Sequence, residues 1–307
     1  MRAFLWFLLL IALGFAGMTL LTYPAWALLG GALPFHRVAN RIGMLTLLAG
    51  FVVMARRLGV ADRTSLGYGL PRCRFLMELA LGLALGVTLM LPVVGAMVLL
   101  DLRDLKPDVV LDAPTLARLT AQGLASGLAV AFIEESFLRG AMFTAIARES
   151  GARLAIVLTA LVYSAIHFFA RYRIPPGQVS GWSGLDLVAG TLQTFAAPLA
   201  IADAFLCLAA VGVLLGAIRR LTGNIAACIG LHAGWVWVIT FLRETSTRDD
   251  SHPLAFLLSR FDGVVGWLLF AWTIVIGVVL HRYYRVRSAA SSRSCRPPKE
   301  PFDMTST

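Results

Sequence analysis

Residues 76–100 read LMELALGLALGVTLMLPVVGAMVLL, an apolar run interrupted by a single charged residue, Glu78. A helix needs roughly 20 apolar residues to cross the hydrocarbon core of a bilayer, and this run is long enough. A strand of a membrane barrel would instead alternate apolar and polar residues over about ten positions. The stretch therefore predicts a transmembrane helix.

Similar apolar runs lie on both sides of it, at 4–29, 38–55, 115–147, 154–170, 195–218, 225–242 and 264–280. The backbone groups of a lipid-exposed segment must be hydrogen-bonded within that segment, which favours helices for all of these runs. The pattern predicts an all-α, polytopic integral membrane protein with about eight transmembrane helices.

The first run has a competing interpretation as a cleavable signal peptide, because Arg2 precedes it and Ala25-Trp26-Ala27 imitates a cleavage site. The apolar core of a signal peptide spans about 7 to 15 residues, and the run at 4–21 is longer. We therefore expect a helix that is retained in the mature chain.

The composition agrees with a lipid environment. Hydrophobic residues make up 58% of the 307 positions and charged residues 14%, and the mean hydropathy is +0.78. These values exclude a soluble, a disordered or a disulfide-rich protein. Although the net charge is +10, no nucleic-acid recognition motif accompanies it, so we expect the lipid bilayer and no nucleic acid as partner.

The basic residues also predict the orientation. If the runs cross the membrane in turn, more Lys and Arg residues fall on the side of the N-terminus than on the opposite side. The positive-inside rule then places both termini in the cytoplasm. Nearly all the basic residues are Arg, which is typical of a GC-rich bacterial genome and indicates a multi-pass protein of the bacterial plasma (inner) membrane.

Ionisable side chains inside the runs are the candidates for chemistry, because a charge at the bilayer centre is costly unless it is paired or hydrated. Residues 133–140 read IEESFLRG. On a helix, Glu135 and Arg139 share a face and can form an ion pair. Glu134 is rotated by about 100° from Glu135 and has no partner on its own helix. We expect Glu134 to act as a general base or acid. The alternative is a structural polar cluster formed by all three side chains.

Two histidines lie at a matching depth. His167 follows Arg153 by as many residues as Glu134 precedes Arg148, which puts both about 21 Å from the same membrane face. His232 comes within reach if the helices tilt. A Glu with two His side chains suits zinc, with Glu134, His167 and His232 as the ligands. A metal-free site in which Glu134 deprotonates water is equally workable, and we favour it. No cofactor is expected.

These residues resemble the motifs of a known family, the CPBP intramembrane proteases, which include the type II CAAX prenyl endopeptidases and the bacterial Abi, or bacteriocin-processing and self-immunity, proteins. The resemblance covers roughly 115–241 and rests on the order and spacing of Glu134, Glu135 and Arg139, then Tyr163 and His167, then Gly230, His232, Gly234 and Trp235.

The resemblance implies that Glu134 activates the attacking water with help from His167, and that His232 stabilises the tetrahedral oxyanion. Glu135 and Arg139 would support the site, with Tyr163 packing beside it. Two positions depart from the family pattern. Tyr163 replaces the usual Phe, which retains ring packing. Val236 stands where an Asn often follows the last His by four residues, and loss of one oxyanion donor can cost about 100-fold to 1,000-fold in rate.

The resemblance and the hydropathy pattern divide the chain into four parts: N-terminal transmembrane helices and loops at 1–114, catalytic core helices at 115–243, a C-terminal loop with the last transmembrane helix at 244–287, and a flexible basic tail at 288–307. The connection at 171–191 is rich in Gly and Pro and is expected to cover an opening in the bundle.

The function expected from these features is an intramembrane endopeptidase that cleaves a membrane-embedded or lipidated peptide or protein, such as a prenylated CAAX-type or other C-terminal substrate. Two alternatives stay open. A catalytically silent membrane scaffold or immunity protein would account for Val236. A proton-coupled transporter would use Glu134, the histidines and Asp203 as a relay, but it would need a path of polar groups across the whole bilayer, and the sequence shows one cluster.

Overall fold

The computed structural model describes residues 1–169 and 172–294, and this part of the chain is mostly helical. Its helices are α1 (Arg2–Leu28), α2 (Phe35–Arg57), α3 (Arg72–Leu99), α4 (Ala113–Glu135), the π-helix η1 (Ser136–Met142), α5 (Phe143–Ser150), α6 (Ala152–Ile166), α7 (Ser183–Ala196), α8 (Pro198–Thr222), α9 (Ala226–Thr245) and α10 (Trp267–Ser294), with short 3₁₀ turns η2 (Pro176–Gln178) and η3 (Ala255–Leu257).

Each apolar run of the sequence forms a helix. Six of the described helical segments are long and apolar enough to cross a membrane: α1, α2, α3, the continuous segment α4-η1-α5, α8 and α9. The apolar parts of α6 and α10, Ala152–Ile166 and Trp267–Leu280, are shorter. The chain is a multi-pass, all-α integral membrane protein, which confirms the predicted fold class.

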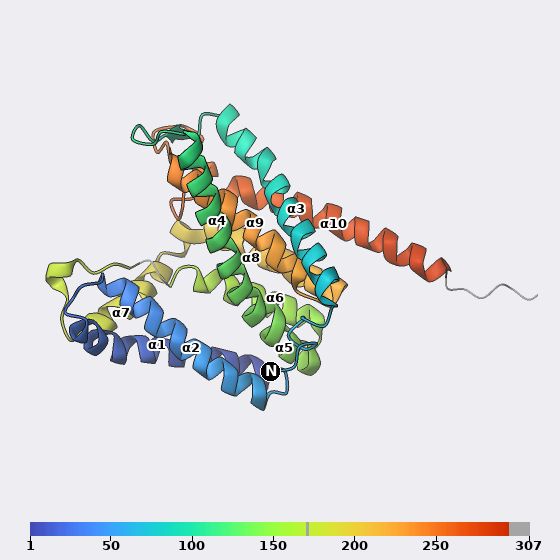
Figure 1. Cartoon of the computed structure of the whole chain (residues 1–307), viewed down its shortest axis with the longest axis horizontal. Helices are drawn as coiled ribbons and strands as arrows, with labels where there is room; N and C mark the ends of the chain where they lie inside the picture. The colour runs from blue at the N-terminus through green and yellow to red at the C-terminus, as the bar shows by residue number, and fades with distance from the viewer. Residues whose placement is uncertain (170–171, 295–307) are drawn as a thin grey trace, which may run out of the picture.

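The helices form two groups (Figure 1). In one group α9 packs between α3 and α4, α6 packs against α8, and α10 lies along α8. In the other group α1 and α2 run side by side, and α7 packs on α1. The first group contains the residues that the sequence marks for chemistry, so its packing determines the site.

Glycines bring α9 close to its neighbours. A Cβ atom added at Gly82 or Gly86 of α3 would lie 2.7 Å from the carbonyl oxygen of Ala227 or 2.5 Å from that of Leu231. On α4, a Cβ atom at Gly127 would lie 2.6 Å from the carbonyl oxygen of Ala233. Small residues of this kind allow membrane helices to approach backbone to backbone. The α9 backbone is therefore held tightly between α3 and α4.

The connections of the bundle gather at two opposite ends. At one end the N-terminal amine forms an ion pair with Glu149, Arg148 donates to the carbonyl of Gly59 at 2.8 Å, and Arg219 donates to that of Ser65 at 3.3 Å. Connections that the alternating pattern assigns to the side of the N-terminus therefore do lie together. That this end faces the cytoplasm stays a prediction.

At the other end a two-stranded antiparallel ladder joins β1 (Arg103–Leu105) to β2 (Ser246–Arg248). Nothing in the sequence pattern predicts it, because three-residue strands are too short to show an alternation. The ladder ties the connection before α4 to the connection after α9.

Two further features differ from expectation. The segment predicted as a connection at 171–191 contains most of α7, and a Cβ atom at Gly184 would lie 2.2 Å from the carbonyl oxygen of Thr19 on α1. The segment thus covers α1. At the other end of the chain α10 runs to Ser294, so it continues into the part predicted as a tail at 288–307. Residues 295–307 lie outside the described part.

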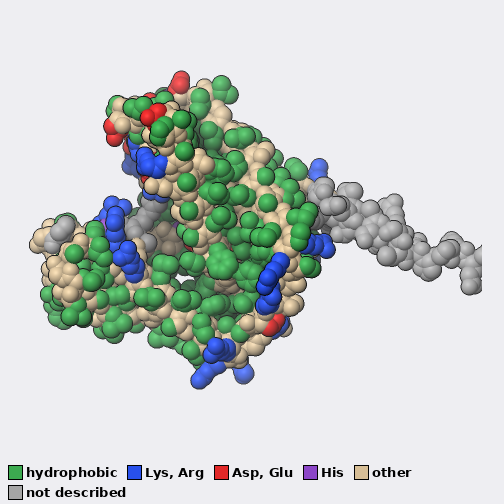
Figure 2. Space-filling model, viewed as in Figure 1, with side chains coloured by type: hydrophobic (Ala, Val, Ile, Leu, Met, Phe, Trp, Pro, Cys, Tyr) green, Lys and Arg blue, Asp and Glu red, His purple; other side chains and the backbone are tan. Residues whose placement is uncertain are grey.

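The surface supports the membrane assignment. Figure 2 shows apolar side chains covering the face formed by α3 and α4, while charged side chains collect toward the ends of the molecule. The exposed apolar side chains of α3 alone include Leu76, Met77, Leu81, Leu91 and Val98. Such a surface requires lipid around it.

Candidate active site

The Glu-Glu pair lies where the fourth predicted span changes its helical geometry. The α-helix α4 ends at Glu135, and the next turns form the π-helix Ser136–Met142 before α5 continues. A π-helical segment inside an α-helix is rare and frequently marks a functional site. Here it carries Arg139 and follows both glutamates directly.

Glu135 and Arg139 form the predicted ion pair, which confirms their pairing. The guanidinium Nη1 of Arg139 donates to Oε1 of Glu135 at 2.9 Å, and both side chains are fully buried. Nη2 of Arg139 also donates to the carbonyl of Gly212 on α8, at 3.2 Å. The pair therefore links α4 and the π-helix to α8. A buried pair of this kind depends on both partners, because removal of one leaves an uncompensated charge.

Glu135 also orients His232. The same carboxylate oxygen, Oε1, lies 2.9 Å from Nδ1 of His232. Because a carboxylate paired with Arg can only accept, Nδ1 carries the hydrogen of this bond. The ring is thereby fixed, and its other nitrogen, Nε2, points toward Glu134 at 4.0 Å from Oε2.

Glu134 is the least paired of these groups. Its side chain is 24% exposed, and its Oε2 atom is buried without a hydrogen-bond partner within the described chain. The separation of 4.0 Å from His232 is too long for a direct hydrogen bond. The carboxylate is therefore free to accept a hydrogen bond from a water molecule, as a general base must.

His167 ends α6 and is fixed in a similar way. Its Nδ1 lies 2.7 Å from the carbonyl oxygen of Tyr163, one turn earlier. Since a carbonyl can only accept, Nδ1 carries the hydrogen of this bond, and the side chain lines the cavity described below. The ring centre of Tyr163 lies 4.5 Å from that of His167 and 5.7 Å from that of His232. The guanidinium carbon of Arg139 lies 4.7 Å from the centre of the Tyr163 ring. Tyr163 thus packs against three of the predicted site residues.

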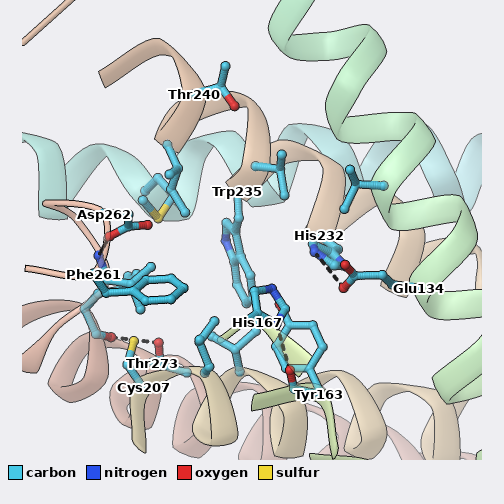
Figure 3. A pocket seen from close by; sticks show the side chains of 18 of the residues that line it. Glu134, Tyr163, His167, Cys207, His232, Trp235, Thr240, Phe261, Asp262 and Thr273 are labelled. Carbon is cyan, nitrogen blue, oxygen red and sulfur yellow. Dashed lines mark hydrogen bonds and ion pairs between the residues drawn. The ribbon is translucent and has the colours of Figure 1, made fainter. Parts of the chain in front are cut away.

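These residues surround a cavity of about 310 Å³. Figure 3 shows Glu134 and His232 at one end and Phe261 and Asp262 at the other, with Trp235 between them. The remaining wall is mostly apolar and includes Met90, Val130, Leu208, Val211, Val236, Ile239, Val265, Leu269 and Ile276. The cavity can hold an apolar peptide segment beside the Glu134 carboxylate.

The structure brings together all six residues that the sequence marks. Glu134, Tyr163, His167 and His232 line the cavity, whereas Glu135 and Arg139 lie behind it and are fully buried.

Two other polar residues, Asn224 and Asp203, do not belong to this cavity wall. The side chain of Asn224 donates to Glu78 at 2.9 Å and accepts from the backbone of Ala226 at 2.9 Å, so it fixes the start of α9. It therefore does not replace the Asn that is missing at Val236. Asp203 accepts from the backbone of Ala204 at 2.7 Å.

A metal would need several ligands close together. Among residues 1–169 and 172–294, no group of three or more His, Cys, Asp and Glu side chains is arranged to hold one. The set of Glu134, His167 and His232 considered from the sequence does not fit a metal in this geometry, and no step below passes through one.

Two other parts of the chain, the loop between α2 and α3 and the helix α8, form hydrogen bonds with the π-helix. The sequence does not reveal these contacts. Arg219 of α8 donates through Nε to the carbonyl of Arg139 at 2.9 Å. The hydroxyl of Ser136 donates to the carbonyl of Phe132 at 2.5 Å, so the contact of 2.5 Å between Tyr68 and Ser136 has Tyr68 as donor. Burial raises the pKa of Tyr68, which keeps this hydroxyl protonated.

The connection before α10 also contributes side chains to the cavity wall. No sequence motif predicts this contribution. Asp262 accepts hydrogen bonds from the backbone of Val264 and Val265 at 2.9 and 2.7 Å. It lines the cavity and also a neighbouring basic pocket that includes Arg103 and Arg243. Burial lowers the pKa of Arg103, which donates to several carbonyls of the surrounding connections.

Comparison with known proteins agrees with this geometry. Residues 116–238 match the family model described as type II CAAX prenyl endopeptidase Rce1-like, and all six residues named above lie inside the match. No curated protein and no solved structure is similar enough to the chain to count as a match. The match over residues 116–238 confirms the resemblance to the CPBP intramembrane proteases.

Proposed function

We propose that the protein is an intramembrane endopeptidase that uses Glu134 to activate water. One observation carries this proposal: Glu134 lines the cavity, and its Oε2 atom, which has no hydrogen-bond partner within the described chain, lies 4.0 Å from the Nε2 atom of a histidine whose other nitrogen is held by Glu135. The match to a protease family supports a peptide bond as the target. Peptide-bond hydrolysis needs a base for water and a donor for the oxyanion, and these groups supply both.

The reaction proceeds by addition and elimination. Glu134 takes a proton from water as the water oxygen bonds to the scissile carbonyl carbon, and His167 orients that water through Nε2. In its protonated form His232 carries hydrogen on both nitrogens, one bonded to Glu135 and the other available to the oxyanion. When the C–N bond breaks, the proton held by Glu134 passes to the leaving amine. The products are a carboxylic acid and an amine, and Glu134 returns to its starting state.

Glu135 and Arg139 act through His232 in this scheme. Their ion pair fixes the position of Oε1, and this oxygen fixes the ring. They are positioning residues, because neither lines the cavity. A rigid support of this kind allows the reacting groups to stay within the narrow range of geometry that catalysis needs.

The substrate that best fits the cavity is a membrane-embedded or lipidated peptide or protein. The apolar wall suits an apolar segment, and the surrounding helices face lipid. A prenylated CAAX-type substrate, or another C-terminal segment, would fit. We place the protein in a bacterial plasma membrane with both termini in the cytoplasm, on the basis of its arginine content and its distribution of positive charge.

The test is turnover of a library of quenched, membrane-anchored peptides by the purified full chain in lipid. We expect wild-type cleavage, with a loss of at least about 1,000-fold in Glu134→Gln and about 100-fold or more in His167→Ala. Glu244→Gln serves as the control, because Glu244 is exposed and outside the cavity. A chelator should leave the rate unchanged. Cleavage that survives in Glu134→Gln would refute the proposal.

Val236 favours a second function, a catalytically silent scaffold or immunity protein, because this residue puts an apolar side chain on the cavity wall at the position of the usual donor. The two functions differ in their dependence on Glu134. If deletion of the protein gives a phenotype that Glu134→Gln fully complements, and no library peptide is cut, the scaffold function is correct.

A further inference from the structure

The cavity contains a hydrogen-bond donor to which the mechanism above gives no role. Trp235 is 7% exposed, and the N–H of its indole ring is buried without an acceptor in the described part of the chain. Its side chain lines the cavity, where it stands between the end formed by Glu134 and His232 and the end formed by Asp262 (Figure 3).

A donor of this kind is unusual, because the great majority of buried polar groups in proteins have a partner. Leaving one unpaired is unfavourable, because the group has lost its hydrogen bond to water. In the free protein this unpaired donor lines a cavity whose wall includes apolar side chains such as Met90 and Leu269. The arrangement indicates a donor kept in place for an acceptor that arrives with the substrate.

We propose that the indole N–H of Trp235 donates to the oxyanion of the tetrahedral intermediate. This inference rests on the proposed function and deepens it. The ring and Glu134 line the same cavity, so a carbonyl bound in it can present its carbon to the water held by Glu134 and its oxygen to the indole N–H. Trp235 thereby supplies the second donor, beside His232, that Val236 does not provide.

The two residues are neighbours on α9, and both line the cavity. An amide at position 236 and an indole N–H at position 235 can therefore reach the same region from one turn of the helix. Gly82 and Gly86 keep this turn against the α3 backbone, so neither donor can move far. A rigid donor costs no reorganisation at the moment of reaction.

The decisive variant removes the donor and keeps the shape of the ring. Replacement of Trp235 by benzothienylalanine, in which sulfur takes the place of the indole N–H, leaves an isosteric side chain. Using peptides that the wild type cuts, we expect kcat to fall by about 100-fold to 1,000-fold with KM almost unchanged. The same replacement at Trp237, which packs against Gly123 of α4 outside the cavity, should leave both constants unchanged.

The second part of the experiment asks whether a donor at the adjacent position restores activity. Val236→Asn introduced beside the modified Trp235 should restore at least about tenfold of the lost kcat, because it returns a donor from the adjacent position. A Trp235 variant that keeps the wild-type kcat overturns the inference, as does one that raises KM alone, which would assign the donor to substrate binding. Absence of cleavage by the wild type would instead refute the proposed function.

Discussion

The two helices that contribute most to the interior, α8 and α9, differ clearly from the pair α1 and α2. Half of the apolar window of α8 and of α9 is buried inside the protein, against 22% for α1 and for α2. The inner pair carries His232, Cys207 and the carbonyl that binds Arg139. The outer pair contributes no side chain to the cavity wall.

This difference shows where a membrane protein can accommodate charged side chains. A charged group facing lipid is expensive, so Glu135, Arg139 and His232 have 0 to 2% exposed side chains and are surrounded by protein. Helices α1 and α2 expose large apolar side chains such as Leu13 and Leu45. The buried polar cluster thus depends on the helices packed around it, and three predictions test that dependence.

The largest effect is expected for the buried ion pair. Arg139→Met leaves the Glu135 carboxylate buried without its main partner, which should lower the free energy of unfolding by about 3 to 5 kcal/mol. Thermal unfolding in lipid measures this. The double variant Glu135→Gln with Arg139→Met should recover part of the loss, because the uncompensated charge is gone. Equal stability of wild type and Arg139→Met would show that the pair does not hold the inner helices together.

A smaller loss of stability is expected when a glycine on the face of α3 that contacts α9 is replaced. Gly86→Ala puts a methyl group 2.5 Å from the Leu231 carbonyl oxygen on α9, whereas Gly95→Ala on the same helix meets nothing within 4 Å. We expect Gly86→Ala to lower the free energy of unfolding by about 1 to 3 kcal/mol through overpacking. Gly95→Ala should be neutral or slightly stabilising. Similar losses for both variants would contradict the close packing of α3 on α9.

The smallest effect concerns the loop that supports the π-helix. Tyr68→Phe removes the hydrogen bond to Ser136 and should cost about 1 kcal/mol of stability. Ser136→Ala should cost a similar amount, and the double variant should cost little more than either one, because the bond is already lost. The unfolding free energies of the four proteins give the coupling. Additive losses would show that the two side chains do not interact.

Much of the fold follows from the sequence alone. The backbone groups of a long apolar run in lipid must be hydrogen-bonded within the run, which favours a helix. The all-α architecture and the approximate bounds of the spans were therefore predictable. The i, i+4 spacing of Glu135 and Arg139 likewise fixes their pairing within one helix. The motif residues around His167 and His232 could be marked as candidates, because ionisable groups are rare inside such runs.

Other features needed the tertiary structure, since contacts between helices are not encoded in any single segment. The π-helix at Ser136–Met142 and its support by Tyr68 and Arg219 join residues that are far apart in the sequence. The position of α7 on α1 also depends on a distant surface. The unpaired N–H of Trp235 is recognisable only when every neighbour that could have accepted it is known. The local hydrophobic pattern determined which segments form helices. The packing of helix on helix determined which polar groups have hydrogen-bond partners and which remain available to a substrate.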